Sequence, residues 1–272
     1  MKRRAIGGKK KLFLKRFYPA GNYTWTVPAG CTEVDVFLVG AGGGSGGYTK
    51  MWGAWGAGGG GYTKTFRGKG YIKPASGTWM GTDKEGRDGD AIIVTPGQRI
   101  PIIVGAGVVN RNGGYTQFMN NNYRADGGKT ASSYTNGGDG GSAGGSWWSV
   151  NNFANGDGAT DGGSTLLSTG QGHTTRDFGE PSGKRNAGGG STGYAGPNEN
   201  GYRPNKGASD YIPGSGQYPP NIYISDKWLQ VQYGGGGYGG GASSGSNSAN
   251  NGGAPLSGGD GTVLLRYWAY EE

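Results

Sequence analysis

Glycine is concentrated in runs along this chain, and these runs constrain the fold more than any other feature. Residues 34–39 have the composition of a β-strand and lead directly into Gly40-Ala41-Gly42-Gly43-Gly44, while residues 234–241 hold seven glycines and one tyrosine. Glycine loses more conformational freedom on folding than any other residue. Ordering such runs therefore requires a packing scheme in which the bare backbone makes the stabilising contacts.

Composition separates this chain from disordered and collagen-like sequences. Glycine accounts for 65 of 272 residues, which alone would suggest low complexity. However, the chain also holds eight Trp and 17 Tyr, and an aromatic content of 12% is high for a disordered sequence. The absence of a Gly-X-Y repeat excludes collagen. We expect a folded chain of one domain or two small ones.

Alternation of polar and apolar residues predicts β-strands near both ends of the chain. Tyr23, Trp25 and Val27 alternate with polar residues, which is typical of a half-buried strand. Pro101 predicts that its strand lies at a sheet edge or starts there, because proline donates no hydrogen bond. No segment has a convincing helical period. The remaining expected strands are residues 34–39, 61–66, 91–94, 100–104, 115–118 and 262–268.

The sequence thus predicts an all-β fold with a β-sandwich-like core closed by N- and C-terminal strands. A large Gly-rich insertion is expected to contain packed polyglycine II helices, extended helices with about three residues per turn. Irregular glycine-rich loops are the alternative. The predicted parts are a basic arm, a β-core, a Gly/Ser/Asn-rich insertion with aromatics and a closing strand, at residues 1–16, 17–118, 119–257 and 258–272.

The net charge of +8 is confined to the N-terminal arm. Eight of the 26 Lys and Arg residues lie in residues 1–16, which contain no acid, and the rest of the chain has 18 basic and 18 acidic residues. Such an arm can bind nucleic acid, a membrane surface or an acidic protein groove. We expect it to anchor the protein on a partner. The anchoring residues are Lys2, Arg3, Arg4, Lys9, Lys10, Lys11, Lys15 and Arg16.

Patterns that resemble catalytic or ligand sites lack the context that their chemistry needs. Gly42-x-Gly44-x-x-Gly47 follows a strand, but no helix follows it to hold a pyrophosphate. Two Gly-x-Ser-x-Gly runs have only His173 as a potential base, and one Cys with one His gives no zinc spacing. Cys31 is interpreted as a small buried residue. We therefore expect no enzyme activity, cofactor or metal.

No signal peptide or transmembrane segment is visible, because Leu12-Phe13-Leu14 is far too short for an h-region. We therefore expect synthesis in the cytoplasm and no membrane insertion.

Aromatic residues spaced through the glycine-rich insertion are the better lead to a function. Tyrosine and tryptophan among Ser, Gly and Asn are typical of recognition loops, because rigid rings give a large contact area at low entropic cost. The alternative is that these rings seal the glycine array or an oligomer interface. The candidate receptor-contact residues are Trp147, Trp148, Phe153, Tyr194, Tyr202 and Tyr211.

One block of sequence resembles the glycine-rich domain found in many tailed-phage virion proteins. The block combines an aromatic strand at residues 18–27, the motif Val27-Pro28-Ala29-Gly30, a hydrophobic strand, and Val39-Gly40-Ala41-Gly42-Gly43-Gly44. Weaker matches continue to residue 268. The resemblance implies tail fibres, adhesins and other virion appendages, which are often trimeric and contact host-surface glycans or proteins. It implies no catalytic residues.

We therefore expect a structural protein of a tailed-phage virion, made in the host bacterial cytoplasm and located in a tail fibre or adhesin. Its expected partners are other virion proteins, through the arm, and the host surface. A capsid-bound head fibre or decoration protein is the alternative. A Gly-rich nucleic-acid-binding protein is a third hypothesis; it would need Arg-Gly-Gly repeats, and none occurs, so we expect no nucleic acid partner.

Overall fold

The computed structural model describes four main stretches of the chain, residues 8–45, 58–68, 90–130 and 257–271. Short stretches in between are also described, at 138–141, 144, 177–179, 186–189, 192–193, 222–224, 227–229, 238–239, 241–242 and 244–245. In these residues the fold is all β, apart from a single 3₁₀ turn, and the prediction of an all-β fold is confirmed. The elements are β1 (Lys10–Phe17), β2 (Gly21–Thr26), β3 (Glu33–Val39), β4 (Thr63–Phe66), β5 (Ile92–Ile93), β6 (Arg99–Val104), β7 (Thr116–Phe118), β8 (Arg124–Ala125), η2 (Asp177–Gly179), β9 (Thr192–Gly193), β10 (Ile222–Ile224), β11 (Lys227–Leu229), β12 (Ser244–Gly245) and β13 (Thr262–Tyr270).

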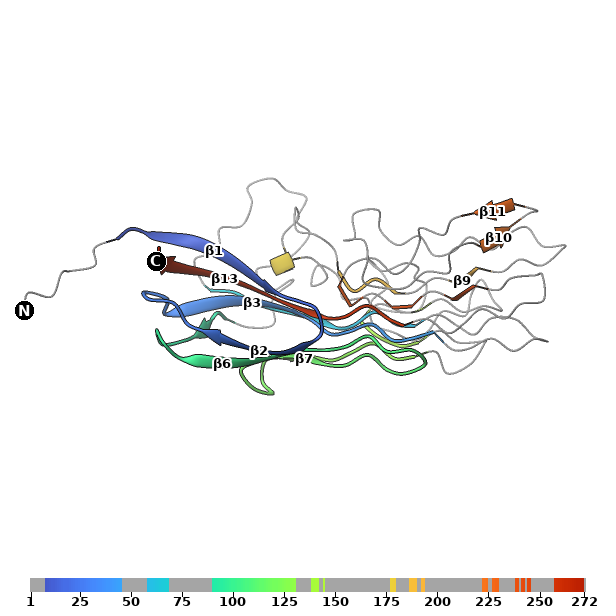
Figure 1. The fold of residues 1–272 in the computed structure, drawn as a ribbon, viewed down its shortest axis with the longest axis horizontal. Coiled ribbons are helices and arrows are strands. Elements are labelled where there is room, and N and C mark those ends of the chain that lie inside the picture. Colours follow the sequence, from blue (N-terminus) through green and yellow to red (C-terminus); the bar gives the residue numbers. More distant parts are fainter. Residues whose placement is uncertain are drawn as a thin grey trace, which may run out of the picture.

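Most of the strands form two antiparallel sheets. The first sheet has the order β1-β13-β3-β4, and β5 pairs with the start of β3. The second sheet has the order β2-β6-β7-β8. Figure 1 shows both sheets at the same end of the molecule, with β2, β6 and β7 along one side of β1, β13 and β3. This arrangement agrees with the predicted sandwich-like core.

The hydrophobic core lies between the two sheets. Trp25 of β2 is buried and its ring packs 5.2 Å from that of Tyr267 on β13 and 6.1 Å from that of Phe118 on β7 (centroid distances). Val36 and Leu38 of β3 contribute to the same cluster. The alternation of polar and apolar residues around Trp25 therefore corresponds to the two faces of β2. Trp25 faces the core, and the residues on either side of it are exposed.

The C-terminal strand lies inside the first sheet rather than at its edge. β13 pairs with β1 on one side and β3 on the other. All residues of its partner β1 except Phe17 belong to the predicted basic arm. Phe13 stacks on Tyr267 with a centroid distance of 5.7 Å, and Phe17 is buried, so the second half of the predicted arm is part of the β-core.

The expectation that Pro101 marks an edge strand is wrong, because β6 lies between β2 and β7. The ladder from β6 to β7 ends at the pair Ile102–Phe118. Met119, which directly follows β7, donates its N–H to the carbonyl of Pro101. Its φ of 63° turns the backbone away from β6 at this point. The missing proline N–H therefore faces a position where β7 has already ended.

Beyond the strands, the glycine segments join in an array of backbone hydrogen bonds. Successive N–H groups of residues 40–44 donate in turn to three segments, residues 58–62, 111–114 and 258–261, with N···O distances of 2.8–2.9 Å. The bonds run from Gly40 to Tyr62, Ala41 to Gly114, Gly42 to Gly259, Gly43 to Gly59 and Gly44 to Arg111. The direction repeats every three residues, whereas a strand repeats every two. This repeat agrees with polyglycine II packing, and the helix itself stays a prediction.

Glycine is needed at several positions of this array because the backbones approach too closely there for any side chain. A Cβ added to Gly40 would overlap the carbonyl of Asp126, and one added to Gly43 would overlap the carbonyl of Lys129. Gly58 and Gly61 face residues 40–44 in the same way. None of these four glycines has a positive φ. Their requirement is therefore steric contact with neighbouring backbone, not unusual dihedral angles.

We expect Gly43→Ala to lower the free energy of unfolding by about 2–3 kcal/mol, because the added methyl must push apart two hydrogen-bonded segments. Gly8→Ala is the matched control, since the nearest atom to its added Cβ is a ring carbon of Tyr270 at 3.8 Å. The control should stay within about 0.5 kcal/mol of the parent protein in urea unfolding. Equal stability of both variants would contradict the close-packed array.

Candidate functional site

The predicted anchoring residues that the structure describes are gathered on and just before β1. Lys10, Lys11, Lys15 and Arg16 lie on this strand, and Lys9 precedes it. The other anchoring residues, Lys2, Arg3 and Arg4, lie outside the described residues. So do all six predicted receptor-contact residues, Trp147, Trp148, Phe153, Tyr194, Tyr202 and Tyr211. The basic strand is therefore the candidate site that the structure allows us to examine.

Alternation along β1 separates its side chains onto two faces. Phe13 and Phe17 face the core between the sheets. Leu12 and Leu14 fall on the opposite, outer face of the first sheet, where Leu12 is the register partner of Trp268. The run Leu12-Phe13-Leu14 is too short for a signal peptide. In β1 it places Phe13 on the inner face and the two leucines on the exposed outer face.

The three lysines of β1 are all exposed, and each has a partner on its own sheet or strand. Lys11 donates to the Glu271 carboxylate with an Nζ···Oε1 distance of 2.6 Å. The ammonium of Lys10 lies 5.7 Å from the ring centroid of Tyr270, and that of Lys15 lies 5.6 Å from the ring centroid of Phe17. Exposed pairs of this kind contribute little to stability. These charges therefore remain available to a partner from outside.

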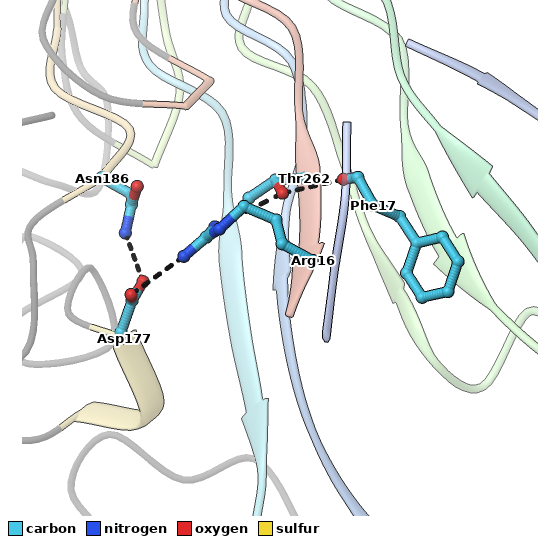
Figure 2. A network of polar contacts seen from close by, with 5 residues as sticks. All are labelled: Arg16, Phe17, Asp177, Asn186 and Thr262. Atoms are coloured by element: carbon cyan, nitrogen blue, oxygen red, sulfur yellow. Dashed lines mark hydrogen bonds and ion pairs between the residues drawn. The ribbon is translucent and has the colours of Figure 1, made fainter. Parts of the chain in front are cut away.

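Arg16 differs from the lysines because it takes part in a partly buried network (Figure 2). Its guanidinium donates to the Asp177 carboxylate at 3.0 Å, and Asn186 donates to the other oxygen of the same carboxylate at 2.8 Å. The side chains of Arg16 and Asp177 are 24% and 17% exposed. The Thr262 hydroxyl donates to the Phe17 carbonyl at 2.9 Å. Arg16 thus fastens η2 to the edge of the first sheet.

A second arginine on the neighbouring strand holds the same turn. Arg266 of β13 forms an ion pair with Asp35 of β3 at 2.8 Å, and its guanidinium lies 4.3 Å from the ring centroid of Phe178 in η2. Phe178 is buried with Phe37 and Leu264 in a small cluster on the outer face of the first sheet. The outer face is therefore covered at the end nearer the glycine array.

The start of β2 is tied to the array through Asp260. Its carboxylate accepts hydrogen bonds from the backbone N–H of Ala20 at 3.1 Å and of Gly107 at 2.9 Å. Tyr18 lies beside this carboxylate and contacts the ring of Tyr238 edge-on. Burial raises the pKa of Tyr18 above its usual range, and the nearby charges of Asp260 and Tyr238 raise it further. Loss of the phenol proton is therefore disfavoured at this junction.

The sequence prediction that Cys31 is a buried structural residue agrees with its position in the core. Burial raises the pKa of the Cys31 thiol, so the protonated form, which is a poor nucleophile, is favoured. Within the described part of the chain, no cluster of three or more metal-ligating side chains occurs. Over the same residues, no helix has the length and apolar character needed to cross a membrane.

Comparison with protein families places this all-β, glycine-rich structure in a known class. A family model described as a glycine-rich domain matches residues 18–268, so the chain belongs to this family. The match begins immediately after β1, which means that the basic strand lies outside the matched region. None of the curated proteins compared with the chain matches it.

Removing the Asp177 carboxylate should destabilise the fold, because Arg16 and the Asn186 amide would then lose a partner in a partly buried place. We expect Asp177→Ala to lower the free energy of unfolding by about 1–3 kcal/mol. Glu271→Ala breaks the exposed pair with Lys11 and should change it by less than about 0.5 kcal/mol. Urea unfolding compares the two, and an equal loss would contradict the structural role of Arg16.

The raised pKa of Tyr18 predicts a loss of stability at alkaline pH. The folded chain binds the phenol proton more tightly than the unfolded chain, so this contribution is complete below the unfolded pKa of about 10. It is lost as the pH rises through the folded pKa. Urea unfolding from neutral pH to about pH 11 should therefore show a shallower alkaline decline for Tyr18→Phe than for the parent protein. Parallel curves would refute this linkage.

Proposed function

We propose that the protein is a non-enzymatic structural component of a tailed-phage virion, located in a tail fibre or adhesin that contacts the host surface. The observation that carries this proposal is that the two ends of the molecule differ in structure. β1 begins and β13 ends at one end, next to the two sheets, while the extended glycine segments and β9, β10 and β11 lie toward the other (Figure 1). An appendage needs this separation between an attachment end and a contact end.

The attachment end has the chemistry for binding a neighbouring virion protein. Lys9, Lys10, Lys11 and Lys15 present exposed positive charge around β1, and the matched family region does not include this strand. Opposite charge on a partner would steer association and fix its orientation. We therefore assign anchoring to this end and assign contact with a host glycan or protein to the insertion, residues 119–257.

The backbone array supports the contact end as a rigid platform. Residues 126–130 of the insertion bond directly to the glycine segments of the β-core, for example from the N–H of Gly59 to the carbonyl of Lys129 at 3.0 Å. A fixed backbone can carry surface residues of varied identity without loss of the scaffold. The proposed oligomer is a trimer, as the resemblance to virion appendages implies. A head fibre or decoration protein would use the same two ends.

The location on the particle can be tested with gold-labelled antibodies against the protein and electron microscopy of intact phage. We expect label on the tail fibres or tail tip. Label on the capsid would replace the tail assignment with the head-fibre alternative. Absence of the protein from purified particles, measured by mass spectrometry, would overturn the virion proposal altogether.

Anchoring by the basic end requires a test that leaves the core intact. Truncation of residues 2–16 would remove β1 except for its last residue, together with the stacking of Phe13 on Tyr267, so charge removal is the sharper change. We expect the combined Lys9→Gln, Lys10→Gln and Lys15→Gln variant to fold normally and to lose most of its incorporation into particles. Normal incorporation of this folded variant would contradict the anchoring role.

A further inference from the structure

Three large apolar side chains are exposed side by side on the outer face of the first sheet. Leu12 and Leu14 of β1 are 50% and 65% exposed, and Trp268 of β13 is 56% exposed. Leu12 and Trp268 are direct register partners, and Leu14 is the next residue on the same face of β1. We call these three residues the outer patch. Single exposed apolar residues are ordinary, but adjacent ones on paired strands indicate a contact surface.

The outer patch continues a surface that the chain already covers elsewhere. On the same face of the same sheet, Phe37 and Leu264 are buried beneath Phe178 of η2 and the half-buried Tyr238. Two arginines, Arg16 and Arg266, lie on this face at the junction of the covered and uncovered parts. The covered part of the outer face is therefore apolar, charged side chains follow it, and the described part beside the attachment end exposes the three residues of the outer patch.

The strand that borders the outer patch is also a sheet edge. β1 comes first in the order β1-β13-β3-β4, and within the described residues β13 is its only strand partner. An edge strand presents backbone N–H and C=O groups that can pair with one more strand. The backbone thus has hydrogen-bonding capacity directly beside the exposed leucines.

The positive charges on β1 limit which kind of strand can pair with its edge. Two copies of β1 brought edge to edge would place lysines near lysines, and like charges on adjacent strands are destabilising. By contrast, a carboxylate already binds this strand, since Glu271 accepts a hydrogen bond from Lys11 at 2.6 Å. Lys11 and Lys15 share one face of β1, while Leu12 and Leu14 share the other. The matching strand therefore alternates acidic and apolar residues.

We propose that β1 and the outer patch bind an extended acidic segment of a partner protein, which adds to the first sheet as a strand beside β1. Its backbone pairs with the free edge, its apolar side chains cover Leu12 and Leu14 next to Trp268, and its carboxylates meet Lys11 and Lys15. Strand addition of this kind takes its affinity from the main chain and its specificity from alternate side chains. The proposal names the chemistry of the anchoring partner and in that respect rests on the proposed function.

Binding can be measured on the purified full-length protein, whatever its location in a particle. The probe is the capped peptide Gly-Glu-Val-Thr-Val-Glu-Gly, titrated into isotope-labelled protein and followed by amide NMR shifts. We expect the largest shifts at β1 and the outer patch. The same peptide with Lys in place of Glu should bind at least tenfold more weakly. Equal binding of both peptides, or no shift at β1, would overturn the proposal.

Two sets of variants separate the outer patch from general effects. Leu12→Thr with Leu14→Thr keeps β-forming side chains and should weaken peptide binding at least tenfold. Val108→Thr is the matched control, because Val108 is 37% exposed and follows β6, outside the first sheet, and it should leave binding unchanged. If the double variant unfolds, Trp268→Thr takes its place with the same expected loss. Unchanged affinity in the folded patch variant would overturn the proposal.

Charge variants and two competing occupants complete the test. Lys11→Gln with Lys15→Gln should weaken binding of the acidic peptide severalfold and reduce its dependence on salt. Sedimentation that shows self-association of the parent protein, lost in Leu12→Thr with Leu14→Thr, would assign the patch to a second copy and overturn the proposal. Stronger binding to vesicles of anionic lipid than to the peptide would overturn it in favour of a membrane surface.

Discussion

The structure depends on direct contact between backbones that carry no side chains. In the array around residues 40–44, each N–H donates to a carbonyl on one of three neighbouring segments, and at Gly40, Gly43 and Gly44 there is no space for a methyl group. This contact replaces the side-chain packing that stabilises ordinary domains. It also explains why glycine is used where the dihedral angles would permit other residues, since Gly40, Gly43, Gly58 and Gly61 have no positive φ.

An array of this kind needs a scaffold that sets the spacing of its segments. The two sheets supply it, because β3 enters the array at Gly40, β4 leaves it after Gly61, and β13 follows it from Gly261. Asp260 adds a polar connection at this boundary by accepting hydrogen bonds from Ala20 and Gly107. The core around Trp25 therefore does more than stabilise the sandwich. It also sets the positions at which the glycine-rich segments begin.

The first sheet has an apolar inner face and also apolar residues on parts of its outer face, whereas an antiparallel sheet commonly presents a polar face to solvent. Its inner face packs on the second sheet, and part of its outer face is covered by η2 with Phe178 held between the sheet and Arg266. The Arg16–Asp177 ion pair and the contact of Arg266 with the Phe178 ring secure this turn, and they lie where the covered part of the outer face ends. Beyond them the sheet exposes Leu12, Leu14 and Trp268 beside an edge strand that carries lysines, and this combination is the basis for assigning attachment to that end.

Much of the fold could be predicted from the sequence because its signals are local. Alternation around Trp25 indicates an inner face, the apolar runs before Gly40 and after Gly261 indicate buried strands, and the glycine runs indicate close backbone packing. The predicted strands at residues 61–66, 100–104 and 262–268 correspond to β4, β6 and β13 with shifts of a few residues at their ends. Local composition was sufficient here because each pattern reflects the immediate burial of its own residues.

Tertiary structure alone decided the features that depend on partners distant in the chain. Lys10–Phe17 carry the charge of a solvated arm, and only pairing with β13, more than 240 residues away, makes them a strand. Pro101 is tolerated in an inner strand because β7 ends opposite it, which no local pattern encodes. Arg16 belongs by sequence with the anchoring lysines, yet Asp177 places it in an internal network. Sequence determined which residues can pack without side chains, and the fold determined which charges face inward and which stay available.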